Sequence, residues 1–464
     1  MKPRLSLLTV CLLLSACGSP VQRPDSGVQA PAAWQSPHSA SVARNNPQWW
    51  TQFGSPELDR LIEQARVGSF DLAAAVARVQ QAQASTVIAG GSLLPEVKAG
   101  LNANRQKLLR GKGYSQLDAD SNNKAVDYFD ANLSATYEID FWGGKQASRD
   151  SAQFALQASE FDRATVELTL LSGVANTYAQ TLSLREQSRI AELNLANAQS
   201  VLKLVQTRFD SGSATALELA QQKSLVAAQQ RQLPLVQQQA QDALISLAAL
   251  LGQPVQQLAA NQESFDRLQW PGIASGVPSD LLTHRPDIAR AEAQLAAAEA
   301  DVKVARAAML PTVTLTAQLG SGADKFDDLI RSPFYNLTAG LVAPIFNNGR
   351  LSAERDKATA RQDELLQTYR GAIINGFADV EKALNSIRGL DEQRQWQSEE
   401  LSQAQTAFNI AQSRYQAGAE DLLTVLETQR TLYAAQDLNV QLRLSRVQAS
   451  IALYKALGGG WQEL

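Results

Sequence analysis

The stretch that decides the fold is DLAAAVARVQQAQASTVIAGGSLLP, residues 71–95, because it aligns without gaps on DIARAEAQLAAAEADVKVARAAMLP, residues 287–311. Arg208–Gly212 then matches Arg414–Gly418, and Leu251-Gly252 matches Leu457-Gly458. Repeats of this kind indicate a duplicated supersecondary unit. Matched residues are 216 apart in the first pair and 206 apart in the later pairs, so the first copy has a longer loop, which we place at 109–123.

Both copies predict the same order of elements: a helix, two strands, a very long helix, a glycine turn and a second long helix. For the first copy, residues 48–262, we expect a helix over 56–94, strands over about 96–109 and 127–141, and helices over 145–210 and 213–251. For the second copy, residues 263–464, we expect a helix over 278–310, strands over about 312–320 and 334–346, and helices over 350–416 and 420–457. A helix of some sixty residues is about 90 Å long, which is unusual in a globular domain.

The long helices carry apolar residues at alternating spacings of three and four. The first copy has Leu195, Ala198, Leu202, Val205 and Phe209, and the second has Leu401, Ala404, Phe408, Ala411 and Tyr415. A sustained period near 3.5 favours a coiled coil, although an amphipathic helix of an ordinary bundle shows a similar pattern. The last helix continues this stripe through Leu423, Leu426, Arg430 and Tyr433. An unpaired charge on an apolar stripe is unfavourable, so we expect Arg430 to have a partner on another helix.

The four predicted strands alternate apolar and polar residues with period 2. In one of them Phe129, Ala131, Leu133, Ala135, Tyr137 and Ile139 alternate with Asp130, Asn132, Ser134, Thr136, Glu138 and Asp140. This pattern predicts either a soluble sheet packed on one face or a membrane barrel with lipid outside and water inside. Membrane barrels have at least about eight strands, since a sheet in lipid cannot leave open edges. If these strands cross a bilayer, several chains must share one barrel.

The N-terminus predicts export and lipid anchoring. A short basic start and the apolar run Leu5–Leu14 form a secretory signal, expected over 1–16, that is too short for a permanent membrane helix. Cys17 follows in a sequence that resembles a bacterial lipobox; an ordinary signal peptide that contains a cysteine is the alternative. We expect a lipidated tether over 17–47, with palmitate or a similar acyl chain on Cys17. Gly18 is not the aspartate that commonly retains lipoproteins in the inner membrane, which favours the outer membrane.

Composition and motifs argue against an enzyme and against a nucleic-acid-binding protein. The net charge is -4, and no cluster of Lys and Arg interleaved with aromatic residues stands out. The two histidines, His38 and His284, stand in no metal-ligand spacing, and there is no P-loop, G-x-S-x-G or H-E-x-x-H motif. We therefore expect no catalytic residue, no metal and no cofactor apart from the covalent lipid on Cys17.

Several motifs in fixed order together carry a family resemblance. They are the lipobox, Gln48–Trp50 followed by Phe53 and Leu58, Arg285–Ile288, Ala343–Phe346, Asn348–Arg350, Tyr415–Gly418 and Leu453–Trp461. With the duplicated plan they resemble the TolC-type outer-membrane efflux family, in the lipoprotein branch that serves resistance–nodulation–division pumps. The resemblance covers nearly all of the mature chain.

The resemblance implies a homotrimer in which each chain gives four strands to one twelve-stranded barrel, continued by a periplasmic helical coiled-coil barrel. A periplasmic adaptor protein and an inner-membrane pump of the resistance–nodulation–division class would be its partners, besides outer-membrane lipid. The periplasmic tip would lie at the turns that contain Gly212 and Gly418.

The resemblance also implies a gate in the resting channel, at positions that correspond to Tyr415, Leu423, Glu427 and Arg430. The family's usual acid at the third position is Asp, so Glu427 departs from the pattern. On physical grounds alone, Glu427 and Arg430 stand three apart on a helix and could simply pair with each other, contributing ~0–1 kcal/mol.

We therefore expect an outer-membrane duct that releases drugs or other small toxic compounds and so supports antibiotic resistance. One alternative is a duct for protein secretion, which the lipobox disfavours. Another is a structural coiled-coil lipoprotein without a pore, which the polar faces of the strands disfavour. The sequence does not indicate the cargo.

Overall fold

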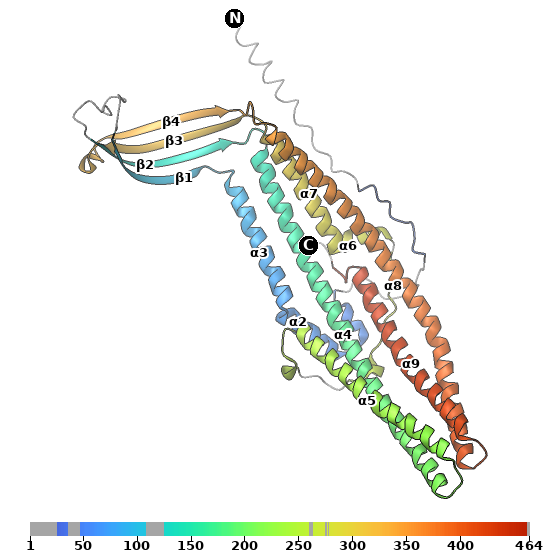
Figure 1. Ribbon diagram of the computed structural model, residues 1–464. Coiled ribbons are helices and arrows are strands. Elements are labelled where there is room, and N and C mark those ends of the chain that lie inside the picture. Colours follow the sequence, from blue (N-terminus) through green and yellow to red (C-terminus); the bar gives the residue numbers. More distant parts are fainter. Residues whose placement is uncertain are drawn as a thin grey trace. The chain divides into compact units, whose positions relative to one another are not determined.

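The computed structural model describes residues 26–35, 47–107, 125–258, 263–273, 276 and 278–461 (Figure 1). Cys17, the signal peptide at 1–16 and the loop at 109–123 lie outside the described residues. The chain forms two compact units, whose boundaries fall within long helices. The strand unit contains mainly Val79–Ser159 and Ala291–Tyr369, and the hairpin unit contains Gly27–Arg78, Glu160–Arg290 and Arg370–Leu464.

Each copy of the duplication gives two strands to a single sheet in the strand unit. The strands are β1 (Glu96–Gln106), β2 (Val126–Ile139), β3 (Thr312–Ala323) and β4 (Pro333–Val342). They pair antiparallel in the order β1-β2-β3-β4, with Asn102 opposite Asp130 and Ala135 opposite Ala317. Within the described residues, β1 and β4 each have a strand neighbour on one side only. The sheet therefore has two open edges, which a membrane barrel must close.

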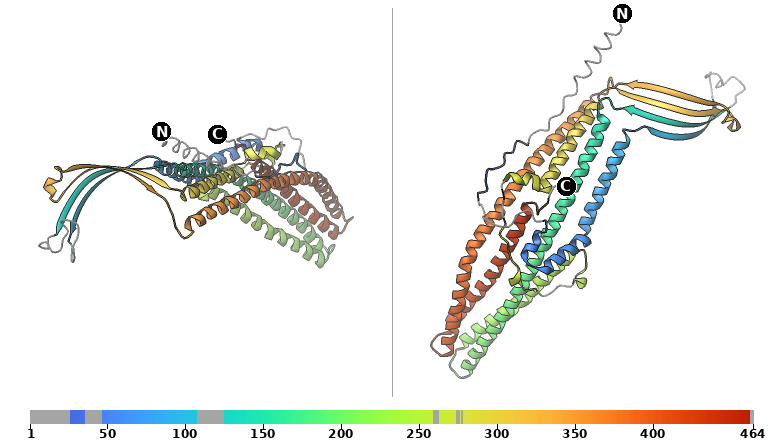
Figure 2. Two further views of the ribbon diagram at one scale, coloured as in Figure 1. Left: turned by 90° about the horizontal axis from the view of Figure 1, so that it is seen from above. Right: turned by 180° about the vertical axis from the view of Figure 1, so that it is seen from behind.

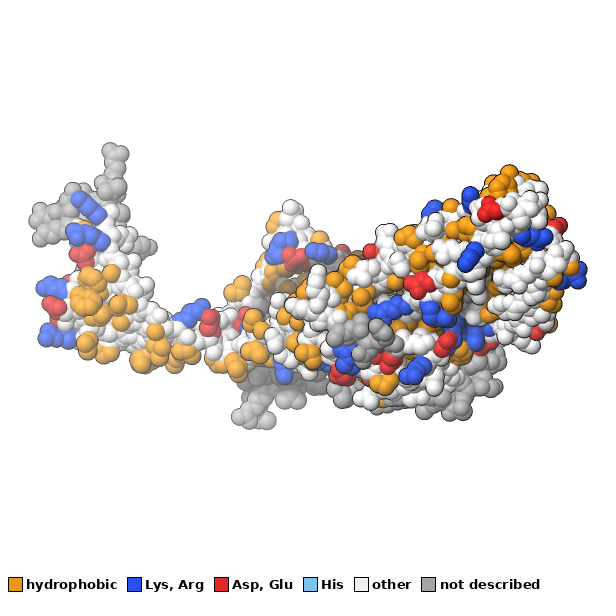
Figure 3. Space-filling model, turned by 90° about the horizontal axis from the view of Figure 1, so that it is seen from below, with side chains coloured by type: hydrophobic (Ala, Val, Ile, Leu, Met, Phe, Trp, Pro, Cys, Tyr) orange, Lys and Arg blue, Asp and Glu red, His pale blue; other side chains and the backbone are white. Residues whose placement is uncertain are grey.

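The alternation predicted for the strands separates the two faces of this sheet. Leu101, Leu133, Leu319 and Leu341 are large apolar residues that remain at least 50% exposed. Figure 3 shows hydrophobic side chains gathered along the strands, at the left of the view. On the polar face, Asp130 accepts hydrogen bonds from the side-chain amides of Asn102 and Asn132, at 3.0 and 2.7 Å. Exposed apolar side chains that gather on one face of a sheet indicate contact with lipid or another chain.

Parts of four helices complete the strand unit. They belong to α3 (Phe70–Gly91), α4 (Gly144–Asp210), α7 (Pro286–Ala307) and α8 (Arg350–Gln416). α7 packs on α8 through Leu295, Ala298 and Leu365, and α3 meets α4 where the Thr86 hydroxyl donates to the Ala152 carbonyl. A short 3-10 turn, η6 (Phe326–Asp328), lies between β3 and β4.

Two helical hairpins lie side by side in the hairpin unit (Figures 1 and 2). The first hairpin consists of α4 and α5 (Ala216–Leu250), and the second of α8 and α9 (Leu422–Ala456). Shorter elements accompany them: η2 (Trp49–Phe53), α2 (Pro56–Gly68), η3 (Val255–Gln257), η4 (Phe265–Arg267), η5 (Pro278–Asp280) and α6 (Leu281–His284). Trp49 stacks on Tyr454 at 5.2 Å between ring centroids, which fixes η2 to α9.

Two of the predicted helices are broken. Instead of one helix over 56–94, the structure has α2 and α3, separated at Ser69, whose backbone is extended and whose hydroxyl accepts from Leu72 N–H. Instead of one helix over 278–310, it has η5, α6 and α7, with Arg285 extended before Pro286. Proline disfavours the helical conformation of the residue before it, which explains the second break.

The remaining bounds differ from the expected ones by a few residues. The predicted strand over 334–346 ends at Val342, and the second helices of the hairpins begin at Ala216 and Leu422. Pro234 lies inside α5, and the helix continues on both sides of it. No helix within the described ranges is both long enough and apolar enough to cross a membrane.

Candidate channel gate at the helical tips

Each hairpin turns at a glycine in the left-handed conformation. Gly212 has φ +75° and Gly418 has φ +77°, a region that other residues enter at a cost. Ser213 N–H reaches back to Arg208 O at 2.7 Å, and Ala419 N–H reaches Arg414 O at 2.9 Å. These bonds satisfy the last carbonyls of α4 and α8 in a Schellman-type C-cap. The structure therefore places both predicted tip residues at equivalent turns.

The helices that leave the turns are capped by side chains. Thr215 and Glu218 form a reciprocal capping box at the start of α5. Asp421 accepts from Thr424 N–H at the start of α9. Hydrogen bonds from the Thr424 backbone and side chain lower the pKa of Asp421, so it is ionised near neutral pH at the positive end of α9.

An apolar cluster holds the two hairpins together near the tip. Its members come from all four helices: Val201, Val205, Leu219, Leu225, Ala404, Phe408, Ala411, Tyr415, Leu422, Val425, Leu426, Leu432 and Ala435. The heptad residues Ala198, Val205, Ala404 and Phe408 are buried, as the 3-4 spacing predicted. The two hairpins therefore share one hydrophobic core, in the manner of a coiled coil.

Two polar links join the first hairpin to the second. The Arg208 guanidinium donates to the Tyr415 carbonyl at 2.8 Å and lies 4.6 Å from the centre of the Tyr415 ring. The Tyr433 hydroxyl donates to the Asn194 carbonyl at 2.8 Å and accepts from the Gln429 amide. Burial raises the pKa of Tyr433 to about 12, so its hydroxyl keeps its proton at neutral pH. Separating the hairpins breaks both links.

The four residues expected to form the gate fall into two groups. Tyr415 is buried beside Arg208, whereas Leu423 is 54% exposed and shares one exposed face of α9 with Glu427 and Arg430. Among the described residues, neither Glu427 nor Arg430 has a side-chain hydrogen bond or ion pair, so the two do not pair with each other. Tyr415 therefore links the two hairpins within one chain. Leu423, Glu427 and Arg430 are exposed and available for contact with a neighbouring molecule.

Sequence reasoning missed Arg208, Asn194 and Tyr433. Arg208 aligns with Arg414, yet Arg414 pairs with Glu420 at the tip of its own hairpin. The duplication therefore gave no signal that Arg208 crosses between hairpins. The predicted stripe on α9 is only partly the packing face: Leu426 is buried and Tyr433 packs against the cluster, as predicted, whereas Leu423 and Arg430 are exposed. α9 also buries Leu422, Val425 and Gln429, which lie outside that stripe.

A chain with an open-edged four-stranded sheet and two long, linked hairpins has the architecture expected of a channel subunit. The sequence profile described as outer membrane efflux protein matches residues 61–253 and 277–459, once for each copy of the duplication. Among the described residues, His, Cys, Asp and Glu side chains form no group of three or more that could hold a metal ion.

Curated relatives and solved structures agree with this class. The chain is 64% identical over 459 residues to the pyoverdine export outer membrane protein OpmQ of Pseudomonas aeruginosa, covering 99% of this chain and 97% of that protein. It is 61% identical to the protein of the same name in Pseudomonas putida, at the same coverage. The solved outer-membrane channel OprN has a TM-score of 0.89 at 26% identity, covering 96% of this chain and 99% of that one.

The chain belongs to the outer membrane efflux protein family. It is the outer-membrane channel component of a tripartite efflux pump, located in the outer membrane and extending into the periplasm. The predicted fold class, a mostly helical, duplicated chain whose strands contribute to a membrane barrel, is confirmed by the solved neighbours.

Proposed function

We propose that three copies of this chain form the exit duct for pyoverdine or a molecule of the same chemical class. The observation that carries the proposal is the 64% and 61% identity, over 99% of the chain, to two proteins named for pyoverdine export. Relatives named for toluene efflux and cation efflux are only 31% and 30% identical. We expect channels that are more alike in sequence to work with more similar partners, and therefore to export more similar cargo.

The proposed trimer follows from the strands. The sheet of one chain leaves β1 and β4 with open edges, and three such sheets joined edge to edge would give a closed barrel of twelve strands. Lipid on Cys17 would hold each chain to the outer membrane. A periplasmic adaptor and an inner-membrane pump of the resistance–nodulation–division class would meet the tips at Gly212 and Gly418.

The proposed gate has two layers. Leu423, Glu427 and Arg430 would form the constriction, each facing the equivalent surfaces of the other copies. Tyr415, held by Arg208, would keep the second hairpin against the first, so that the constriction cannot widen. Loss of these contacts on adaptor binding would open the tip.

Complementation tests the cargo. A Pseudomonas aeruginosa strain that lacks OpmQ and expresses this chain is expected to release pyoverdine into the medium at close to the wild-type amount, measured by mass spectrometry. The relative named for toluene efflux, expressed to the same level, is the control and should restore little release. If this chain restored drug tolerance but not pyoverdine release, the cargo assignment would be wrong, whereas the channel assignment would stand.

Removal of the Arg208 link is expected to favour the open tip. The hydrogen bond and the cation–π contact together stabilise the closed arrangement by about 1–2 kcal/mol at a half-exposed site, so Arg208→Ala should raise the open-to-closed ratio roughly 5–30-fold. Conductance in planar bilayers measures this ratio. Arg414→Ala is the matched control, because the equivalent arginine pairs within its own hairpin. Equal conductance in the two variants would remove Arg208 from the gate.

A further inference from the structure

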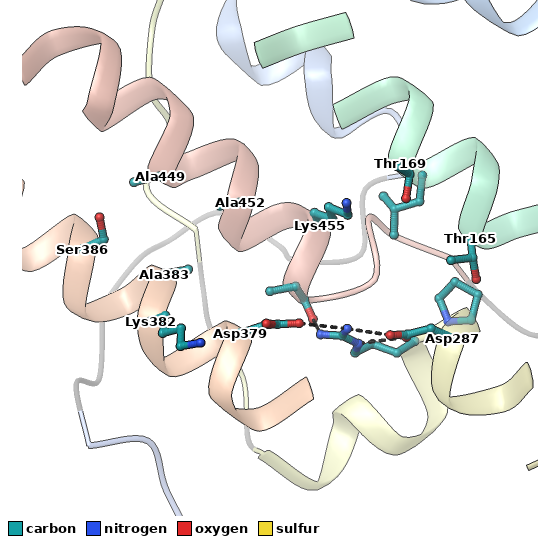
Figure 4. Close-up of a pocket in the computed structure, with 14 residues that line it drawn as sticks. Thr165, Thr169, Asp287, Asp379, Lys382, Ala383, Ser386, Ala449, Ala452 and Lys455 are labelled. Atoms are coloured by element: carbon teal, nitrogen blue, oxygen red, sulfur yellow. Dashed lines mark hydrogen bonds and ion pairs between the residues drawn. The ribbon is translucent and has the colours of Figure 1, made fainter. Parts of the chain in front are cut away.

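A pocket of about 420 Å³ lies in the hairpin unit between α4, α7, α8 and α9 (Figure 4). Its apolar lining includes Ala383, Ala449 and Leu168, and its polar lining includes Thr165 and Thr169 on α4. Pockets of this volume, with apolar walls and a few convergent polar groups, are typical of small-molecule sites. None of its lining residues belongs to the gate, and the channel function described above does not use it.

An ion network closes one end of the pocket. Arg285 is buried and donates to both carboxylate oxygens of Asp287, at 3.0 and 2.7 Å. It also donates to Asp379 at 3.1 Å and to the Ala456 carbonyl at 3.1 Å. The two aspartates are thus both engaged by one guanidinium. The network of Arg285, Asp287 and Asp379 therefore carries one net negative charge.

Two lysines also line the pocket, Lys382 on α8 and Lys455 on α9. Both are exposed, and neither makes an ion pair or hydrogen bond with its ammonium group among the described residues. With Arg285 they give three positive groups against two negative ones. The lining therefore combines apolar residues with an excess of one positive charge, which favours an anion that has an apolar part.

The duplication provides an internal control for these charges. The two copies are related by a separation of 216 residues before the strands and 206 residues after them. At these separations Ser69 corresponds to Arg285, Asn176 to Lys382 and Ala249 to Lys455. In both copies, the glycine after the second hairpin helix lies against a backbone carbonyl of the segment before the helix that leads to the strands. Gly252 lies against the Gly68 carbonyl, and Gly458 lies against the His284 carbonyl; we call this contact the junction. A positive residue in the last turn of a helix is favoured by the helix dipole. Even so, the first copy builds the same junction without a single one of the three cations.

The pocket lies on the side of α8 and α9 opposite to two contacts made by the described part of the N-terminal segment. Trp34 packs on Phe377 of α8, and Trp49 stacks on Tyr454 of α9. Asp379 and Ala456, each two residues further along, line the pocket. A step of two residues along a helix turns the side-chain direction by about 200°, so the pocket residues lie on nearly the opposite side of the helix from Phe377 and Tyr454. In the proposed trimer the lipid-anchored end of each chain would lie outside the duct, so the side that carries the pocket would face the lumen.

We infer that this pocket is a lumenal binding site for an anionic small molecule, and that Lys382 and Lys455 hold a carboxylate group of the exported cargo as it passes. The lumenal position of the site and the assignment of the ligand as cargo rest on the proposed function. The binding site itself does not.

The test uses the full-length chain, purified as its oligomer in detergent, with 6-bromohexanoate as the probe and 6-bromohexan-1-ol as its uncharged match. Dissociation constants come from ligand-observed NMR, and the bromine position comes from anomalous scattering in crystals. We expect the carboxylate to bind at least about tenfold more tightly than the alcohol. Lys382→Gln combined with Lys455→Gln should remove that difference. Lys357→Gln, an exposed lysine on the same helix α8 outside the pocket, should preserve it.

Equal binding of the two probes, equal binding to the wild type and the double variant, or a bromine peak outside the pocket would each overturn the site. The charge-preserving Lys455→Arg variant guards against misfolding, since it should retain the tighter binding of the carboxylate. Pyoverdine release by the double variant then tests the cargo assignment, with a fall of several-fold expected. Release at the wild-type level, with probe binding lost, would overturn that assignment alone. If the wild-type chain releases no pyoverdine, the proposed function fails, and the probe experiment still decides the site.

Discussion

Gly458→Ala is expected to lower the stability of the chain by about 3 kcal/mol or more, because two costs add at this position. Gly458 has φ +89°, and an L-residue in the left-handed region costs roughly 1–2 kcal/mol. A Cβ at this position would also lie 1.9 Å from the His284 carbonyl oxygen and 2.9 Å from its carbon. Backbone cannot rotate aside as a side chain can, and overpacking costs typically about 1–3 kcal/mol more.

Thermal unfolding of the purified oligomer, followed by circular dichroism, measures this loss. Gly252→Ala should have a similar effect, since its Cβ would lie 2.1 Å from the Gly68 carbonyl oxygen at the equivalent junction. Gly371→Ala is the matched control, because it lies inside α8 with open space around it and alanine favours helix. An unfolding temperature of Gly458→Ala equal to that of Gly371→Ala would show that the junction relaxes freely.

This junction illustrates what the sequence could and could not predict. The alignment of Leu251-Gly252 with Leu457-Gly458 located both glycines. Their role depends on a chain segment more than 170 residues away, and no local pattern reports such an approach. The strands and the long helices were predictable because period 2 and period 3.5 are local signals. The break at Arg285 also had a local signal in Pro286, whereas the break at Ser69 had only a serine and the preceding glycine.

The gate was predicted less completely than the fold, for a physical reason. Neighbouring positions on α9 are apolar enough to serve as a packing face, and the position of the other helices selects the face through Leu422, Val425 and Leu426, which includes only part of the predicted stripe. That choice leaves Leu423 and Arg430 exposed and therefore available to other copies. The links from Arg208 and Tyr433 end on backbone carbonyls, which every residue has. A sequence cannot indicate which carbonyl a donor will reach.

Arg285→Ala is expected to destabilise the hairpin unit by about 2–4 kcal/mol. The substitution removes the partner of two carboxylates and of the Ala456 carbonyl, and breaking a buried pair from one side costs about 3–5 kcal/mol. The lower figure allows for the exposure of Asp287 and Asp379, whose side chains are 31% and 48% exposed, against 9% for Arg285. Arg285→Lys keeps the charge but loses the two-bond geometry, so it should recover only part of the loss.

The pH dependence of this loss separates the ion network from simple packing. Burial raises the pKa of Asp287, but the hydrogen bonds and charge of Arg285, with the backbone N–H of Ile288, outweigh it and lower the pKa below its usual value. A carboxyl group whose pKa is lowered on folding stabilises the protein above its unfolded pKa, about 3.9, and loses this contribution as the pH falls through its folded pKa. The difference between wild type and Arg285→Ala should therefore be largest near neutral pH and should shrink below about pH 4.

Arg290→Ala is the control for this experiment. Arg290 also lies on α7 and also pairs with an aspartate, Asp162, at 2.7 Å, but its side chain is 40% exposed. An exposed pair contributes ~0–1 kcal/mol, so this variant should unfold close to the wild type at every pH. If Arg285→Ala were equally mild, the network would be a surface pair in solution. A large loss that stayed constant from pH 7 to pH 3 would mean instead that the arginine acts by filling space between α7, α8 and α9, and that its charge is incidental.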